Sequence, residues 1–160
     1  MTRYSHSLIG VSVAYVLGYP LIPALIASTL PDIDVKWQRK RGGLLFSHRG
    51  ITHHLLFVII LIFSAVLIQN VVFKSFAIGY ISHILADILT ISGVPYFKHK
   101  NRISLKLFST GSIGEYVFVS SLIFIIVLIF AFSNSFYIPV DIQFIFEIIR
   151  NINSYISISI

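Results

Sequence analysis

Residues 76–91, FAIGYISHILADILTI, combine an apolar run with two ionisable side chains, His83 and Asp87. The length and apolar character of the run predict a membrane-spanning helix, which needs about 20 residues or slightly fewer. His83 and Asp87 are four residues apart, so they lie one turn apart on one face of that helix. An ionisable group at membrane depth is costly unless it is paired, metal-bound or facing water. The pair can therefore ligate a metal ion, join two helices by a hydrogen bond, or relay a proton.

The composition of the whole chain indicates an integral membrane protein. Of 160 residues, 56% are hydrophobic and 11% are charged, against about 25% charged residues in soluble proteins. The length fits a single domain, residues 1–160. The chain has no cysteine, which excludes disulfides, thiolate metal sites and cysteine nucleophiles. The net charge of +6 suggests basic loops that face anionic lipid headgroups, and we expect no nucleic-acid partner.

Two more apolar stretches, Leu55–Phe73 and Tyr116–Phe132, predict spanning helices. The first apolar segment, residues 8–30, is harder to interpret, because Gly18-Tyr19-Pro20 favours a turn in its middle. It forms a membrane-dipping hairpin, a single kinked span or, as an alternative, a signal peptide. The tail, residues 136–160, predicts an interfacial amphipathic helix. We therefore expect an all-α fold, a polytopic helical bundle with three spanning helices after the first segment.

The basic residues predict the orientation in the membrane. Five lie between residues 36 and 49 and four between residues 98 and 106. Two crossings separate these loops, so the loops share a face, which the positive-inside rule makes cytoplasmic. We expect a protein of a bacterial or archaeal cell membrane with its site facing the cytoplasm.

Eight of the 12 Asp, Glu and His residues gather in four short segments: His6; Asp32 and Asp34; His48, His53 and His54; His83 and Asp87. Singly, these segments have ordinary explanations, such as a capping turn at residues 31–34 or a helix start at which Thr52 is the cap. The predicted topology brings them to one face, although His6 joins them only if the first segment is a hairpin. Carboxylate and imidazole ligands without thiolate suit zinc, iron or manganese. The combination predicts a metal site.

His6 is followed by PDID at 31–34, SHRGITHH at 47–54, GYISHILADILT at 79–90 and SGVP at 92–95. This order, over roughly residues 5–115, resembles the YdjM-like family of predicted membrane-bound metal-dependent hydrolases. That family looks like a distant relative of zinc-dependent phospholipases C and related single-strand nucleases, which hold two or three zinc ions. The resemblance implies one to three divalent ions, zinc first, with ligands at His6, Asp32 or Asp34, His48, His53, His83, Asp87 and Glu115. His54 lies outside the family pattern. For Glu115 the alternative is a helix-start carboxylate favoured by the helix dipole.

We expect a hydrolase in which a metal-activated water cleaves a phosphoester of a lipid headgroup or lipid-linked phosphate. Asp34 would orient the water or act as general base, and Arg49 with Arg102 would hold an anionic phosphate. The expected partners are membrane lipids and an anionic or phosphorylated substrate.

The alternative function is a metal-ion or proton translocator that uses His83 and Asp87. The small number of spans and the gathering of the ligands at one face argue against it. A non-catalytic scaffold would leave the clustered ligands unexplained.

Overall fold

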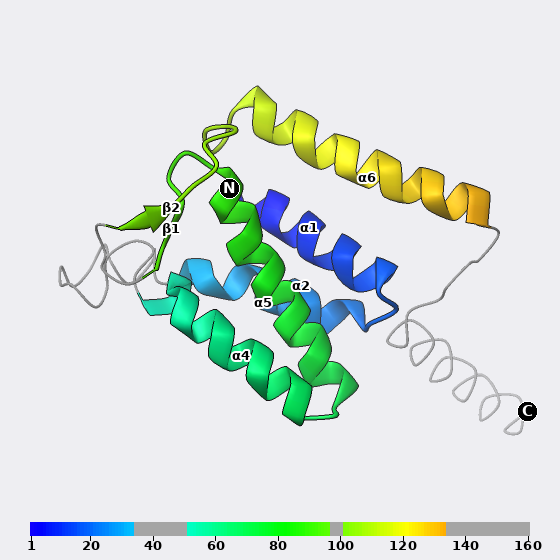
Figure 1. Cartoon of the computed structure of the whole chain (residues 1–160). Helices are drawn as coiled ribbons and strands as arrows, with labels where there is room; N and C mark the ends of the chain where they lie inside the picture. The colour runs from blue at the N-terminus through cyan, green and yellow to red at the C-terminus, as the bar shows by residue number, and fades with distance from the viewer. Residues whose placement is uncertain (34–50, 97–100, 134–160) are drawn as a thin grey trace, which may run out of the picture.

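The structure, a computed structural model, describes residues 1–33, 51–96 and 101–133 (Figure 1). These residues are mostly helical, as predicted, with a small two-stranded sheet that the sequence did not indicate. The helices are α1 (Arg3–Val16), α2 (Leu21–Thr29), α4 (Leu55–Leu67), α5 (Val71–Leu89) and α6 (Ile113–Ser133), with 3-10 helices η1 (Leu30–Ile33) and η3 (Ile51–His53). Strands β1 (Val94–Pro95) and β2 (Arg102–Ile103) pair antiparallel.

The first apolar segment is a helical hairpin. After α1, Gly18 adopts a φ of 72°, a left-handed conformation that glycine adopts at little cost. The Gly18 N–H donates to the Tyr15 carbonyl, and the Tyr19 N–H donates to the Ala14 carbonyl at 2.9 Å, which is the Schellman arrangement of a helix end. α1 and α2 then pack against each other and against α5 (Figure 1). Of the topologies left open by the sequence, the structure therefore has the hairpin.

α5 is the central helix, and small residues let α2 approach it closely. A Cβ atom placed on Gly79 would lie 2.7 Å from the Cα of Ala24, so only glycine fits there. The hydroxyl of Ser75 donates to the Pro20 carbonyl at 2.5 Å, which ties the hairpin turn to α5. α5 also contributes to both apolar clusters of the core, one shared with α2, α4 and β1 and the other with α1 and α6. It thus holds the other helices in register around His83 and Asp87.

Within the described ranges, α5 is the one helix long and apolar enough to cross a membrane. Its 19 residues make about 29 Å of helix, close to the hydrocarbon thickness of ~30 Å. The prediction of one span over Leu55–Phe73 is wrong, because α4 ends at Leu67 and Asn70 caps α5 by accepting a hydrogen bond from the Phe73 N–H at 3.0 Å. A bundle with three spanning helices is not confirmed, and spanning by α4 and α6 stays a prediction. The predicted helix at 136–160 lies outside the described residues.

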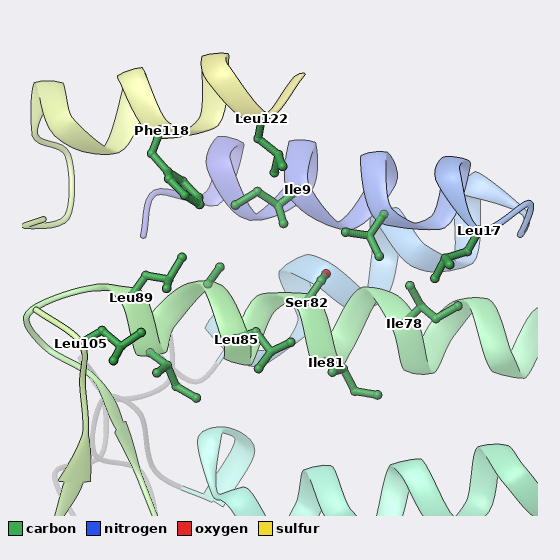
Figure 2. A pocket seen from close by; sticks show the side chains of 13 residues that line it. Ile9, Leu17, Ile78, Ile81, Ser82, Leu85, Leu89, Leu105, Phe118 and Leu122 are labelled. Carbon is green, nitrogen blue, oxygen red and sulfur yellow. The ribbon is translucent and has the colours of Figure 1, made fainter. Parts of the chain in front are cut away.

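An apolar groove of about 430 Å³ runs between α1, α5 and α6 (Figure 2). Its lining includes Ile9 of α1, Leu17 directly after α1, Leu85 of α5 and Phe118 of α6, with Ser82 as its polar member. Elsewhere many large apolar side chains of the helices are exposed. Many exposed apolar side chains and an apolar groove are typical of a protein that contacts lipid.

Candidate metal centre

Five of the predicted ligands meet near the carboxyl end of α5: His6 of α1, Asp32 of η1, His53 of η3, and His83 and Asp87 of α5. The histidines and Asp87 are at most 1% exposed, and Asp32 is 9% exposed. The predicted convergence of residues distant in the chain is therefore present. Asp34, His48 and Arg49 lie outside the described residues, so their predicted roles stay predictions.

Local structure explains why these side chains meet. Thr2 caps α1, which places His6 in the first turns of that helix, and the hairpin returns the chain through α2 to Asp32. His53 ends a short 3-10 helix directly before α4. The spacing of His83 and Asp87 on α5 puts both side chains on the face that receives the other ligands.

The ligand atoms form two overlapping groups, and within each group they lie within 4.8 Å of one another. In the first group, His6 Nε2 lies 3.4 Å from Asp87 Oδ1, and His83 Nε2 lies 3.9 Å from Asp87 Oδ2. The rings of His6 and His83 stack with their centroids 3.6 Å apart. Ligand atoms about 2 Å from a tetrahedral zinc ion lie roughly 3.3 Å from one another. The distance from His6 Nε2 to Asp87 is close to this value, and the distance from His83 Nε2 to Asp87 is about 0.6 Å longer.

The second group contains Asp32, His53 and His83. Asp32 Oδ1 lies 3.8 Å from His53 Nε2 and 3.9 Å from His83 Nε2, and the two Nε2 atoms are 3.2 Å apart. Asp87 joins the groups, because its Oδ2 also lies 3.6 Å from His53 Nε2. Its Oδ1 accepts a hydrogen bond from the Met1 ammonium at 2.6 Å, which partly balances the charge of the two carboxylates.

Hydrogen bonds outside the two groups fix the tautomers of two histidines. The carbonyl of Ser28 lies 2.6 Å from His83 Nδ1, and a carbonyl can only accept, so Nδ1 carries the proton. The Thr52 hydroxyl donates its one proton to the Pro31 carbonyl and therefore accepts from His53 Nδ1 at 3.1 Å. In its neutral form each of these histidines then has a lone pair on Nε2. The two Nε2 atoms lie beside each other and beside the carboxylates of Asp32 and Asp87. A shared cation is what such a set of acceptors needs.

The burial of His6 is a second observation that fits a metal ion at this position. Its ring is 1% exposed, yet neither ring nitrogen makes a hydrogen bond within the part of the chain that the structure describes. Buried polar atoms without such a partner are uncommon and costly. A metal ion beside Asp87 would satisfy His6 Nε2.

Sequence reasoning placed the start of α4 incorrectly. The prediction that Thr52 caps this helix is wrong: the cap is His54, whose Nδ1 accepts from the Leu56 N–H at 3.3 Å. Thr52 instead orients His53, and the Tyr80 hydroxyl donates a hydrogen bond to the Thr52 carbonyl. The residues that orient the histidines were not predicted. The Ser28 contact uses the backbone, so no side-chain motif could indicate it.

Glu115 and Arg102 lie apart from these groups. The Glu115 carboxylate, 0% exposed, accepts hydrogen bonds from Thr2, Ser5 and Gly111, and it belongs to neither group of potential ligands among the described residues. Its role as a ligand stays a prediction. Arg102 donates to the Ser92 carbonyl at 2.9 Å, and its predicted contact with a phosphate also stays a prediction.

Comparison with known proteins identifies the family. Residues 1–138 match the family model described as YdjM inner membrane protein. The chain belongs to the YdjM family. It is 39% identical over 88 residues to the inner membrane protein YdjM of Escherichia coli (strain K12), and equally to that of Shigella flexneri. Each match covers 45% of this chain and 45% of the relative, so the aligned part spans less than half of the curated proteins. No solved structure matches the chain.

Proposed function

We propose that this YdjM-family chain is a membrane-bound hydrolase whose buried His and Asp residues hold one to three divalent ions, zinc first. The observation that carries the proposal is the orientation of His53 and His83, whose Nε2 atoms lie 3.2 Å apart beside the carboxylate of Asp32. Imidazole and carboxylate without thiolate suit zinc, iron or manganese. A bound ion of this kind activates water for hydrolysis and stabilises charge on a phosphoryl oxygen.

The buried residues of the centre would bind the ions and exclude water. His6, Asp32, His53, His83 and Asp87 would hold the ions, and their burial would exclude bulk water from the centre. Asp32 is the most exposed of the five, which favours it as the ligand nearest to an entering water molecule.

Two further residues have proposed roles in catalysis. Asp34 follows Asp32 by two positions and would orient the water or take its proton. Arg49, with its planar set of donors, would hold an anionic phosphate.

The proposed substrate is a phosphoester of a lipid headgroup or a lipid-linked phosphate, cleaved at the cytoplasmic face. Support comes from the family, whose relatives are named inner membrane proteins, and from the exposed apolar helices and the groove lined by Ile9, Leu85 and Phe118. Such a surface lets a substrate reach the protein without leaving the bilayer.

Metal analysis of the protein purified in detergent tests the proposal directly. His83→Ala and Asp87→Ala should each remove bound zinc and abolish hydrolysis in a screen of phosphoester and lipid substrates. His54→Ala is the matched control, because His54 caps α4 and belongs to neither group of ligands. A His83→Ala protein that retains stoichiometric zinc would refute the assignment.

The second candidate is a metal-ion or proton translocator. The observation in its favour is that His83 and Asp87 lie on α5, the candidate spanning helix. Five ligands gathered near one end of α5 argue for a fixed centre instead of a path across the membrane. Proteoliposome flux that depends on His83 would reverse this preference.

A further inference from the structure

The carboxylate of Glu115 connects the start of α6 to the start of α1. Its Oε1 accepts from the Thr2 N–H at 2.7 Å, the Thr2 hydroxyl at 2.9 Å and the Ser5 hydroxyl at 2.5 Å. Its Oε2 accepts from the Gly111 N–H at 2.9 Å. Oε1 thus accepts three of the four hydrogen bonds, and all three come from the start of α1. Three of the four contacts bridge more than 100 residues of sequence.

The two donor residues, Thr2 and Ser5, lie at the start of α1, and Ser5 directly precedes His6. Thr2 is the cap of α1, and its hydroxyl also contacts the Ser5 hydroxyl at 2.8 Å. Glu115 therefore fixes the cap and the first turn of the helix that carries His6. The next turns of α1 pack on α6 in an apolar cluster that includes Ile9 and Val119.

His6 depends on its helix for its position more than the other histidines do. His83 is oriented by the Ser28 carbonyl and His53 by the Thr52 hydroxyl. Within the described residues, neither ring nitrogen of His6 makes a hydrogen bond. The backbone of α1, the stacking on His83 and the 3.4 Å approach to Asp87 Oδ1 therefore position its ring.

We propose that Glu115 is a positioning residue that holds the first turn of α1 so that His6 presents Nε2 to Asp87. The inference rests on the proposed function in one respect, since the position of His6 matters for a bound ion. It differs from the role implied by the family resemblance, in which Glu115 itself ligates the metal. To bind an ion through Oε1, the carboxylate would have to give up hydrogen bonds to Thr2 and Ser5, whereas a positioning carboxylate keeps them.

The test compares four variants in detergent by two measurements, zinc binding and hydrogen–deuterium exchange of the peptide that covers α1. Glu115→Ala removes the acceptor, and Ser5→Ala removes one donor. Glu115→Gln keeps an oxygen that can accept the contacts made by Oε1, so it should rescue much of the loss. Ser112→Ala is the matched control, because the Ser112 hydroxyl accepts from the Glu115 N–H at 3.4 Å at the same helix start and, within the part of the chain that the structure describes, makes no hydrogen bond to α1.

For a positioning role, Glu115→Ala should raise exchange in the first turns of α1 and weaken zinc binding about 10–100-fold, the usual effect of losing a group that supports a ligand. At saturating zinc it should still bind the full number of ions. Ser5→Ala should act in the same direction with a smaller effect, and Ser112→Ala should match the unaltered protein.

Two results would overturn the inference. One is a Glu115→Gln protein that binds fewer ions at saturation while exchange in α1 is unchanged, which is the signature of a lost ligand. The other is unchanged exchange in α1 for both Glu115→Gln and Ser5→Ala, a result that needs no folded Glu115→Ala protein. If the unaltered protein binds no zinc, the proposed function fails, but the exchange measurement still decides whether Glu115 holds α1.

Discussion

Replacing Gly79 with alanine should push α2 away from α5 and disturb the metal centre. The new Cβ would lie 2.7 Å from the Cα of Ala24, about 1 Å inside the ~3.5–4.0 Å optimum for two carbon atoms. The obstructing atoms belong to the backbone of α2, so they cannot move aside by rotation of a side chain. We expect a cost of about 2–3 kcal/mol, in the upper part of the range for an overpacked core.

The displacement should also weaken metal binding, because α2 carries the carbonyl of Ser28 that orients His83. A shift of that carbonyl lengthens its 2.6 Å contact with His83 Nδ1. We expect zinc affinity to fall at least about tenfold, as it does when a group that orients a ligand is lost.

Thermal unfolding and zinc titration of the purified protein measure both effects. At about 2–4 °C per kcal/mol for a chain of this size, Gly79→Ala should lower the Tm by about 4–12 °C. Gly114→Ala is the control, because its Cβ would meet the Phe108 Cβ at 3.4 Å, an ordinary contact distance. If Gly79→Ala melts and binds zinc like Gly114→Ala, the close approach of α2 and α5 that we describe is incorrect.

Two other predictions follow from the centre itself. Thr52→Val keeps the side-chain shape but removes the acceptor for His53 Nδ1. Zinc affinity, measured by competition with a chelating dye, should therefore fall about 10–100-fold. An unchanged affinity would mean that His53 is oriented in another way. Chelation of zinc should lower the Tm of the unaltered protein, since an ion at 100 times its Kd stabilises the folded state by about 2.7 kcal/mol. The same chelation should leave the Tm of His83→Ala unchanged, and an equal shift in both proteins would place the ion elsewhere.

The sequence predicted that His6, Asp32, His53, His83 and Asp87 lie together better than it predicted the boundaries of the helices. The spacing of His83 and Asp87 was sufficient to put them on one face, because helical periodicity is a local property. The place of His6 depended on the hairpin, which the sequence left open beside a single span. Within residues 55–73, Gln69 and Asn70 mark the break between α4 and α5, and the prediction of a single span did not take this polar pair into account.

Contacts distant in sequence could not be predicted in the same way. The sequence indicated that Glu115 begins a helix, but not that Thr2 and Ser5 donate to it across more than 100 residues. The role of Thr52 was not predicted, because its hydroxyl can either cap a helix or hydrogen-bond to an imidazole. The second possibility is selected by the fold, which brings the Pro31 carbonyl to the Thr52 hydroxyl. The residue types thus predicted a group of potential metal ligands, whereas tertiary packing determines which groups orient these ligands.

The turn between α1 and α2 has a consequence for how this protein can sit in a lipid environment. A chain reversal surrounded by hydrocarbon must satisfy its own peptide groups, since no solvent is present to do so. Here the N–H groups of Gly18 and Tyr19 are satisfied by α1, and the oxygen of Pro20 receives the Ser75 hydroxyl. If the turn enters the bilayer, these three peptide groups are already paired within the protein.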